Sequence, residues 1–179
     1  MPPSEPVTDA LTVPAQTGTS GTLPHVLIID DNQYDIDLTR IAFVENGFDV
    51  TITTAKDGEE AAQLIRRLAT DPGLILPDLI LLDLNLPRMN GVGVLALIRS
   101  ESALKHIPVV VLTTSEFPAD RQRCLALGAS AFIIKSHRLH DFFTSIKALG
   151  AYLDRSGKRQ AAAAPSPAIL ARPPSDGPQ

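Results

Sequence analysis

Short apolar runs alternate along this chain with longer segments whose apolar residues recur at helical spacing. Runs without polar alternation are typical of strands buried on both faces of a sheet. With one segment rich in Val, Ile and Thr, they predict five strands, at His25–Asp30, Asp49–Ala55, Asp78–Leu82, Pro108–Leu112 and Ser130–Ile134. Five helices are expected between and after them, at Tyr34–Asn46, from Asp57 to Asp71, at Val92–Ser100, from Pro118 to Gly128, and along Leu139–Leu149. This strict alternation predicts a doubly wound α/β fold with a five-stranded parallel sheet.

The periodicity also indicates which residues line the first and last helices. The first has apolar spacing at Leu38, Ile41 and Ala42, continued by Glu45, and Gly47 provides a stop. The last is lined by Leu139, Phe142, Phe143, Ile146 and Leu149.

Both ends of the chain differ in composition from its middle. Ten of the fifteen prolines lie in Met1–Pro24 and Ser156–Gln179, together with many small residues. Segments of this kind bury too little apolar surface to offset the entropy of the chain. We therefore expect disordered tails at residues 1–23 and 156–179 around one folded domain at residues 24–155.

Charge and cysteine content narrow the function classes. The net charge of −4 leaves no basic stripe for nucleic acid. Cys124 is the single cysteine, which excludes an intrachain disulfide. No apolar run reaches the roughly 20 residues of a membrane span, and the N-terminus lacks the pattern of a signal peptide. A cytoplasmic protein without nucleic-acid or membrane partners is expected.

The chemically active side chains fall at the ends of the predicted strands. Asp30 and Asp31 end the first strand, Asp83 the third, Thr113 the fourth and Lys135 the fifth. Because the carboxyl ends of parallel strands share one edge of the sheet, these side chains are expected to meet there. Each has a simple explanation alone, such as a helix cap, a loop acid or a surface lysine, but their joint placement indicates a site. Three crowded carboxylates repel one another unless a cation lies among them, and their oxygens suit Mg²⁺.

Phosphoryl transfer to a carboxylate fits this set of residues. Asp83 would be the nucleophile, Mg²⁺ would bridge it to the incoming group, and Lys135 and the Thr113 hydroxyl would bind other phosphoryl oxygens. A phosphohydrolase with an aspartyl nucleophile would need an acid two residues later, where this chain has Asn85. A flavin-binding protein would need a neutral phosphate loop after the first strand, where Asp30 and Asp31 would repel a phosphate.

Four motifs resemble the receiver domains of response regulators. They are Ile29-Asp30-Asp31-Asn32, Leu82-Asp83-Leu84-Asn85-Leu86-Pro87 with Met89-Asn90-Gly91, Val111-Leu112-Thr113-Thr114-Ser115, and Phe132-Ile133-Ile134-Lys135. The resemblance covers nearly the whole predicted domain, and the complete set argues against a degenerate receiver that acts only as a scaffold. It implies a flavodoxin-like (βα)5 fold with strand order 2-1-3-4-5.

The resemblance also implies roles for the acids. Asp83 would be the phosphoacceptor. Asp31 and Asp83 would bind Mg²⁺ through their carboxylates, Asp30 would act through water, and the backbone carbonyl of Asn85 would be a further ligand. Asn85 and Ser115 would flank the attacking water and so set how fast the phosphate is lost.

The same resemblance implies a switch. Thr113 and Lys135 would bind the phosphoryl group, and Phe132 would turn inward when Thr113 moves, while Thr114 would gate access to the phosphate. Two departures from the family pattern matter. Phe132 replaces a more frequent Tyr, and Ser136 stands where a proline, commonly in a cis peptide, usually follows the lysine, so a trans peptide is expected here.

A phosphorylation-driven switch without its own enzymatic activity on other molecules is therefore expected. The segment from Asp83 to Arg88, with Val111–Ser115 and Lys135-Ser136, also resembles the single-domain regulators that pair with phytochrome-type or other hybrid sensor kinases. The resemblance implies that a sensor histidine kinase of this kind would donate the phosphoryl group. The face formed by the fourth helix, fifth strand and fifth helix would then change its protein contacts, including those of a homodimer. Because residues after Arg155 are too few and too rich in Pro and Ala for an output domain, the alternative is a phosphorelay intermediate or a phosphate sink.

Overall fold

The computed structural model describes residues 23–153. Apart from Leu23, the predicted tails lie outside the described residues. In chain order the elements are β1 (His25–Ile29), α1 (Gln33–Glu45), β2 (Thr51–Ala55), α2 (Gly58–Thr70), β3 (Leu79–Leu82), α3 (Gly91–Ser100), β4 (Val109–Thr113), α4 (Pro118–Ala126), β5 (Ala131–Ile134), α5 (Leu139–Lys147) and α6 (Gly150–Leu153). The five strands and five principal helices match the predicted elements, and α6 is an additional short turn of helix.

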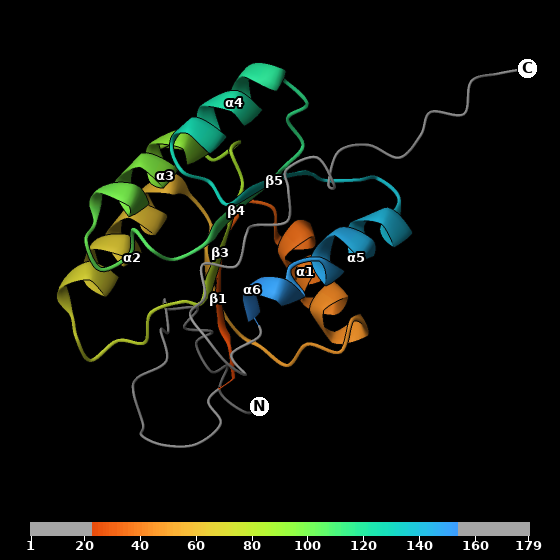
Figure 1. Ribbon diagram of the computed structural model, residues 1–179, viewed down its shortest axis with the longest axis horizontal. Coiled ribbons are helices and arrows are strands. Elements are labelled where there is room, and N and C mark those ends of the chain that lie inside the picture. Colours follow the sequence, from red (N-terminus) through yellow and green to blue (C-terminus); the bar gives the residue numbers. More distant parts are fainter. Residues whose placement is uncertain (1–22, 154–179) are drawn as a thin grey trace, which may run out of the picture.

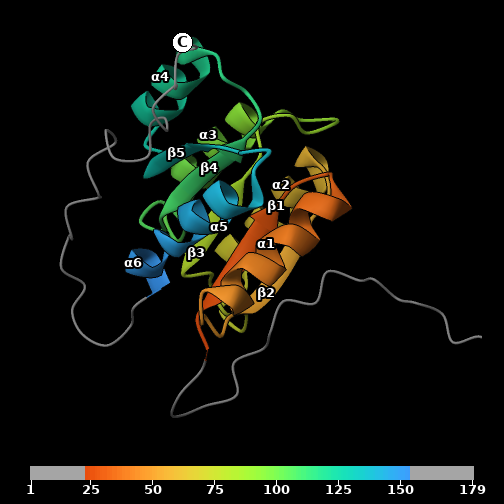
Figure 2. The same cartoon turned by 90° about the vertical axis from the view of Figure 1, so that its right-hand side faces the viewer.

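The five strands form one parallel sheet in the order β2-β1-β3-β4-β5, which confirms the expected flavodoxin-like topology. Ile29 at the end of β1 pairs with Ala55 of β2 and with Leu82 of β3, so these three strands end at the same level. Helices α1 and α5 cover one face of the sheet, and α2, α3 and α4 cover the other (Figure 1, Figure 2). The strand order reverses direction at β1, so the carboxyl ends of β1 and β3 form the switch point where such sheets bind ligands.

The strands are buried on both faces because each side of the sheet has its own hydrophobic core. Leu27 and Ile29 of β1 pack with α2, α3 and Phe132 on one side. Val26 and Ile28 point to the other side and pack with α1 and α5. Alternate residues of a strand point to opposite faces, so an unbroken apolar run supplies both cores. The need to supply two cores explains why the strands could be identified from apolar runs without polar alternation.

The helical spacing identified α1 and part of its buried face. Of the predicted positions, Ala42 is fully buried and Leu38 packs against the core, but Ile41 is 51% exposed and Glu45 is exposed as well. Ile36 and Phe43 are fully buried and were not predicted. Two apolar stripes run along this helix, and the one that contains the aromatic ring packs against the sheet, since it buries more apolar surface. In α5 the predicted lining is correct for the buried Phe142 and Ile146, but Leu139 is 56% exposed.

Helix α4 is held differently at its two ends. At its start, Phe117 makes no side-chain capping bond, and Pro118 occupies the first turn as expected. After its end, Gly128 has a positive φ of 91°, which suits a glycine. There the Arg99 guanidinium from α3 donates to the Gly128 carbonyl at 2.8 and 3.0 Å and to the Ile107 carbonyl at 3.0 Å. Along its length, α4 buries only Cys124.

Within residues 23–153, no helix is long and apolar enough to cross a membrane.

Candidate functional site

The carboxyl edge of the sheet brings the three strand-end acids together. Asp83 follows β3, and its N–H donates to the Ile29 carbonyl at 2.9 Å, while the N–H of Asp30 donates to the Ala55 carbonyl at 3.0 Å. Sheet hydrogen bonding therefore continues into both acidic residues and fixes their backbones. Carboxylate oxygens of Asp30, Asp31 and Asp83 all lie within 4.8 Å of one another. Asp30 and Asp83 are buried and Asp31 is exposed, so the cluster opens to solvent on one side.

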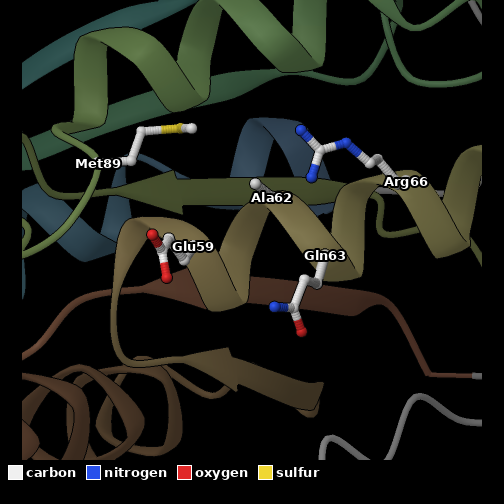
Figure 3. Close-up of a pocket in the computed structure, with 5 residues that line it drawn as sticks. All are labelled: Glu59, Ala62, Gln63, Arg66 and Met89. Carbon is white, nitrogen blue, oxygen red and sulfur yellow. The ribbon is translucent and has the colours of Figure 1, made fainter.

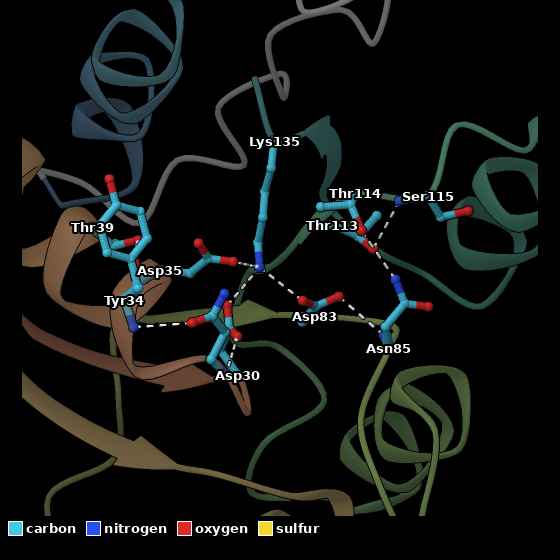
Figure 4. Close-up of polar contacts among 11 residues, drawn as sticks. Asp30, Tyr34, Asp35, Thr39, Asp83, Asn85, Thr113, Thr114, Ser115 and Lys135 are labelled. Carbon is cyan, nitrogen blue, oxygen red and sulfur yellow. Dashed lines mark hydrogen bonds and ion pairs between the residues drawn. The ribbon is translucent and has the colours of Figure 1, made fainter. Parts of the chain in front are cut away.

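Lys135 lies in the middle of this cluster, 8% exposed, and binds three carboxylates (Figure 4). Its Nζ is 2.7 Å from Asp30 Oδ2, 2.7 Å from Asp83 Oδ2 and 2.8 Å from Asp35 Oδ2. An ammonium group has three N–H donors, so these contacts use all of them. Sequence reasoning missed Asp35 because an acid in the first turn of a helix is usually explained by the helix dipole.

The pKa values reflect burial and crowding together. Burial lowers the pKa of the Lys135 ammonium, but the charges of Asp30 and Asp83 outweigh burial, and the net pKa is raised above its ordinary value. Burial raises the pKa of Asp30, and the opposing effects of Lys135 and the Asn32 N–H do not fully offset it. The positive charge and hydrogen bonds around Asp30 therefore do not fully offset the cost of burying its ionised form.

The composition of the cluster fits a hard divalent cation. The cluster gathers four carboxylates and one ammonium: Asp30, Asp35 and Asp83 contact Lys135, and Asp31 lies beside Asp30 and Asp83. All the donors are oxygens, which Mg²⁺ prefers over softer ligands. The raised pKa of Asp30 points the same way, because a nearby cation would favour its ionised form. Asp30, Asp31 and Asp83 could therefore hold the cation that the sequence predicted.

The main chain around Asp83 is held closely on the side of α3. The N–H of Asn85 donates to Asp83 Oδ1 at 3.0 Å, which places the backbone of Asn85 beside the cluster. A Cβ at Gly91 would lie 2.1 Å from the Asp83 carbonyl oxygen, so only glycine allows α3 to begin this close to Asp83. The side chain of Asn90 caps α3 by accepting the N–H of Gly93 at 2.9 Å. These contacts explain the Asn-Gly pair in the second motif.

The predicted hydroxyl residues lie on the side of Asp83 away from the Lys135 ammonium (Figure 4). Thr113 is fully buried, and its Oγ1 accepts the N–H of Ser115 at 3.2 Å. The Asn85 amide donates to Thr114 Oγ1 at 3.2 Å. Ser115 Oγ donates to Asp120 Oδ2 on α4 at 2.6 Å, a contact that the sequence did not indicate. The loop after β4 is thus bonded both to the Asp83 loop and to α4.

Phe132 and Ser136 lie where the motifs predicted them. Phe132 is 4% exposed and packs in the core between the sheet and α4, so its ring already points inward. The described residues contain no cis peptide bond, and the Lys135–Ser136 bond is trans as expected. Ser136 Oγ instead accepts the N–H of Arg138 at 3.1 Å and shapes the loop before α5.

A shallow hollow of about 270 Å³ lies elsewhere, along α2 (Figure 3). It is lined by Glu59, Ala62, Gln63, Arg66 and Met89. None of the clustered acids lines it, so it is separate from the candidate site.

Comparisons with known proteins agree with this geometry. The response regulator receiver domain family matches residues 26–147. The chain is 34% identical over 127 residues to the probable methanogenesis regulatory protein FilR2 of Methanothrix harundinacea, covering 71% of this chain and 81% of that protein. It is 32% identical over 127 residues to the response regulator Rcp1 of a Synechocystis species, covering 71% and 86% of the two chains.

Solved structures give the same result. The crystal structure of the phosphorylated cyanobacterial phytochrome response regulator RcpA superposes with a TM-score of 0.68 at 34% identity, covering 76% of this chain and 98% of that one. A family match over more than half of the chain, a shared topology and acids gathered at the expected sheet edge lead to one conclusion. This chain belongs to the response regulator receiver domain family.

Proposed function

We propose that this protein is a phosphorylation-dependent switch in which Asp83 accepts a phosphoryl group from a phosphohistidine of a sensor histidine kinase. The observation that carries the proposal is the buried ion pair at 2.7 Å between Lys135 Nζ and Asp83 Oδ2, inside a cluster of three further carboxylates. Asp83 is buried and has a fixed cationic neighbour, and the cluster around it opens to solvent at Asp31. These are the surroundings that a phosphoryl acceptor needs.

In the proposed step, a carboxylate oxygen of Asp83 forms a bond to phosphorus while the bond from phosphorus to the imidazole nitrogen of the donor breaks. The electron pair of that bond stays on the imidazole, and the product on Asp83 is an acyl phosphate. Asp31, Asp83 and the backbone carbonyl of Asn85 would hold Mg²⁺ directly and Asp30 would do so through water, and the cation would supply positive charge to the phosphoryl oxygens. Lys135 contributes the fixed charge on the opposite side, since it already contacts Asp83.

The response is proposed to pass through the hydroxyl residues. The Thr113 hydroxyl, now bonded by the Ser115 N–H, would turn to a phosphoryl oxygen, with Phe132 filling the space behind it. Asn85, Thr114 and Ser115 would tune the lifetime of the acyl phosphate. The surface of α4, β5 and α5 would then change its contacts with a protein partner, a second copy of this chain among them.

The relatives favour a particular kind of donor. RcpA is described as a phytochrome response regulator and was crystallised in phosphorylated form. We therefore propose a phytochrome-type or hybrid histidine kinase in the cytoplasm as the donor for this chain. Onward phosphotransfer to another protein, or service as a phosphate sink, is the alternative output. Beyond its own phosphorylation and dephosphorylation, no catalytic activity is proposed.

Replacement of the acceptor tests the proposal. Wild-type protein incubated with acetyl phosphate and Mg²⁺ should gain the mass of one phosphoryl group, and the adduct should be lost with hydroxylamine, as acyl phosphates are. Asp83→Asn should abolish the adduct, because the amide is not a nucleophile of this kind. Asp37→Asn is the matched control, since Asp37 is an exposed acid of α1. An Asp83→Asn protein that gains the adduct at the wild-type rate would show that the acceptor lies elsewhere.

A further inference from the structure

We propose that Asp35 is a positioning residue for Lys135, which holds the ammonium so that one N–H faces residue 83 before and after phosphoryl transfer. The inference rests on the proposed function and extends it to a residue outside the four motifs. Asp35 Oδ2 lies 2.8 Å from Lys135 Nζ, nearly as close as the oxygens of Asp30 and Asp83.

The three partners approach the ammonium from different elements. Asp30 follows β1 and Asp83 follows β3, whereas Asp35 comes from the first turn of α1, which covers one face of the sheet (Figure 4). Lysine carries its charge on a flexible four-carbon stem, so its position depends on the contacts made by the ammonium. Three anchors from three directions fix that position, which two anchors at the sheet edge would leave free to rotate.

The turn between β1 and α1 fixes the direction of Asp35. The N–H of Asn32 donates to Asp30 Oδ1 at 2.9 Å, and the Asn32 side chain caps α1 by accepting the N–H of Tyr34 at 3.0 Å. The Asp35 carbonyl accepts the Thr39 hydroxyl at 2.8 Å inside the helix. Asp30 is thus linked through the helix cap to the turn that carries Asp35. The positions of both lysine partners therefore depend on the same β1–α1 turn.

Asp35 is also the anchor that phosphorylation would not alter. When Asp83 becomes an acyl phosphate, its carboxylate charge is lost and the phosphoryl oxygens become the better acceptors. The N–H that Asp83 Oδ2 receives can then move to a phosphoryl oxygen. The N–H groups bound by Asp30 and Asp35 stay in place, so the ammonium remains aimed at residue 83.

A different role for Asp35 would be an ordinary ion pair that only stabilises the fold. Its side chain is 21% exposed, against 6% for Asp30 and Asp83, so as an ion pair alone it would contribute less to stability than those two acids do. A positioning residue would change the rate of phosphoryl transfer through Lys135, whereas a purely stabilising ion pair would not. A double-mutant cycle of Asp35 and Lys135 measures this difference directly.

The test compares the wild-type full chain with Asp35→Asn, Asp35→Glu and the control Asp37→Asn, with acetyl phosphate and Mg²⁺ and intact-mass detection. At saturating donor, the maximal rate of Asp35→Asn should fall about tenfold, the scale of losing one charge-assisted hydrogen bond. The donor concentration for half-maximal rate should change little. Asp35→Glu should recover part of the rate because it restores the carboxylate, and Asp37→Asn should match the wild type. Thermal melts establish that each variant is folded.

Two further measurements separate positioning from stability and from the proposed function. In a Lys135→Ala background, Asp35→Asn should have no further effect on the rate. In metal-free protein without any phosphoryl donor, acetylation of the Lys135 amine by an acylating reagent should be severalfold faster in Asp35→Asn than in Asp37→Asn, as measured on the Lys135 peptide by mass spectrometry.

Wild-type rates and unchanged Lys135 acetylation in Asp35→Asn would overturn the inference, and so would full additivity with Lys135→Ala. A wild-type protein that is not phosphorylated, but in which Asp35→Asn still speeds Lys135 acetylation, would overturn the proposed function while leaving the anchoring of Lys135 by Asp35 supported.

Discussion

Asp83 lies between two flanks that differ in chemistry. The lysine flank consists of Asp30, Asp35 and Lys135, joined by charged contacts of 2.7–2.8 Å in a largely buried place. The hydroxyl flank consists of Asn85, Thr113, Thr114 and Ser115, which are joined to one another by neutral hydrogen bonds of 3.2 Å, and two of these residues are exposed. Its contact with a charged group is the 2.6 Å bond from Ser115 to Asp120 on α4. Charge-assisted hydrogen bonds are about twice as strong as neutral ones, and three of them meet at Lys135. The comparison indicates a fixed flank and an adjustable flank, which under the proposed function would hold the acceptor and respond to its phosphorylation, respectively.

The largest effect is expected from breaking the lysine flank. Lys135→Met keeps the stem but removes the ammonium, which leaves carboxylates of Asp30 and Asp83 crowded and unpaired. Removing one partner of a buried ion pair costs about 3–5 kcal/mol of unfolding free energy, less whatever the acids recover by taking up protons. Urea unfolding at neutral pH should show this loss, while Lys147→Met, an exposed residue of α5, should show almost none. Equal stabilities of the two variants would mean that the lysine flank is not fixed by charge.

A smaller effect is expected on the hydroxyl flank. Ser115→Ala removes the 2.6 Å bond to the Asp120 carboxylate and should lower the unfolding free energy by about 1.5 kcal/mol. Asp120→Asn should cost about the same, with an additional small loss because the acid lies in the first turn of α4. Since both changes break one bond, the double variant should cost less than the sum. A loss with Ser115→Ala as large as that with Lys135→Met would remove the difference between the flanks.

The pH dependence should be the most modest signal. The pKa of Asp30 is raised from 3.8 in the folded protein, mainly by burial, so the folded state holds its proton to higher pH than the unfolded chain. Its contribution to stability is therefore present in acid and lost as the pH rises from 3.8 through the raised value. As the pH rises through that range, the unfolding free energy of the wild type should fall relative to that of Asp30→Asn, as measured by urea unfolding at a series of pH values. A difference that shifts in favour of the wild type would mean that Lys135 outweighs burial at Asp30.

The sequence predicted where the site lies, but it did not predict all of the residues that contribute to it. Asp30, Asp83 and Lys135 were identifiable because buried strands end in an ordered way at one edge of a parallel sheet. Asp35 and Asp120 were not, since each is a first-turn acid on a helix and its direction depends on how that helix packs. The error at Ile41 in α1 has the same origin: Ile41 and Phe43 both have helical spacing, and only tertiary packing decides between them.

Helix α4 illustrates how the adjustable flank reaches the rest of the molecule. Beyond its last turn, the Arg99 guanidinium grips the Gly128 carbonyl with two donors, whereas its first turn is tied to the strand-end loop chiefly through Ser115 and Asp120. Arg99 thus holds the residue after the last turn of α4, and the Ser115–Asp120 bond connects its first turn to the loop after β4. A shift of that loop would therefore move the first turn of α4, while Arg99 holds the residue after its last turn at the amino-terminal edge of the strands, on the same face of the sheet.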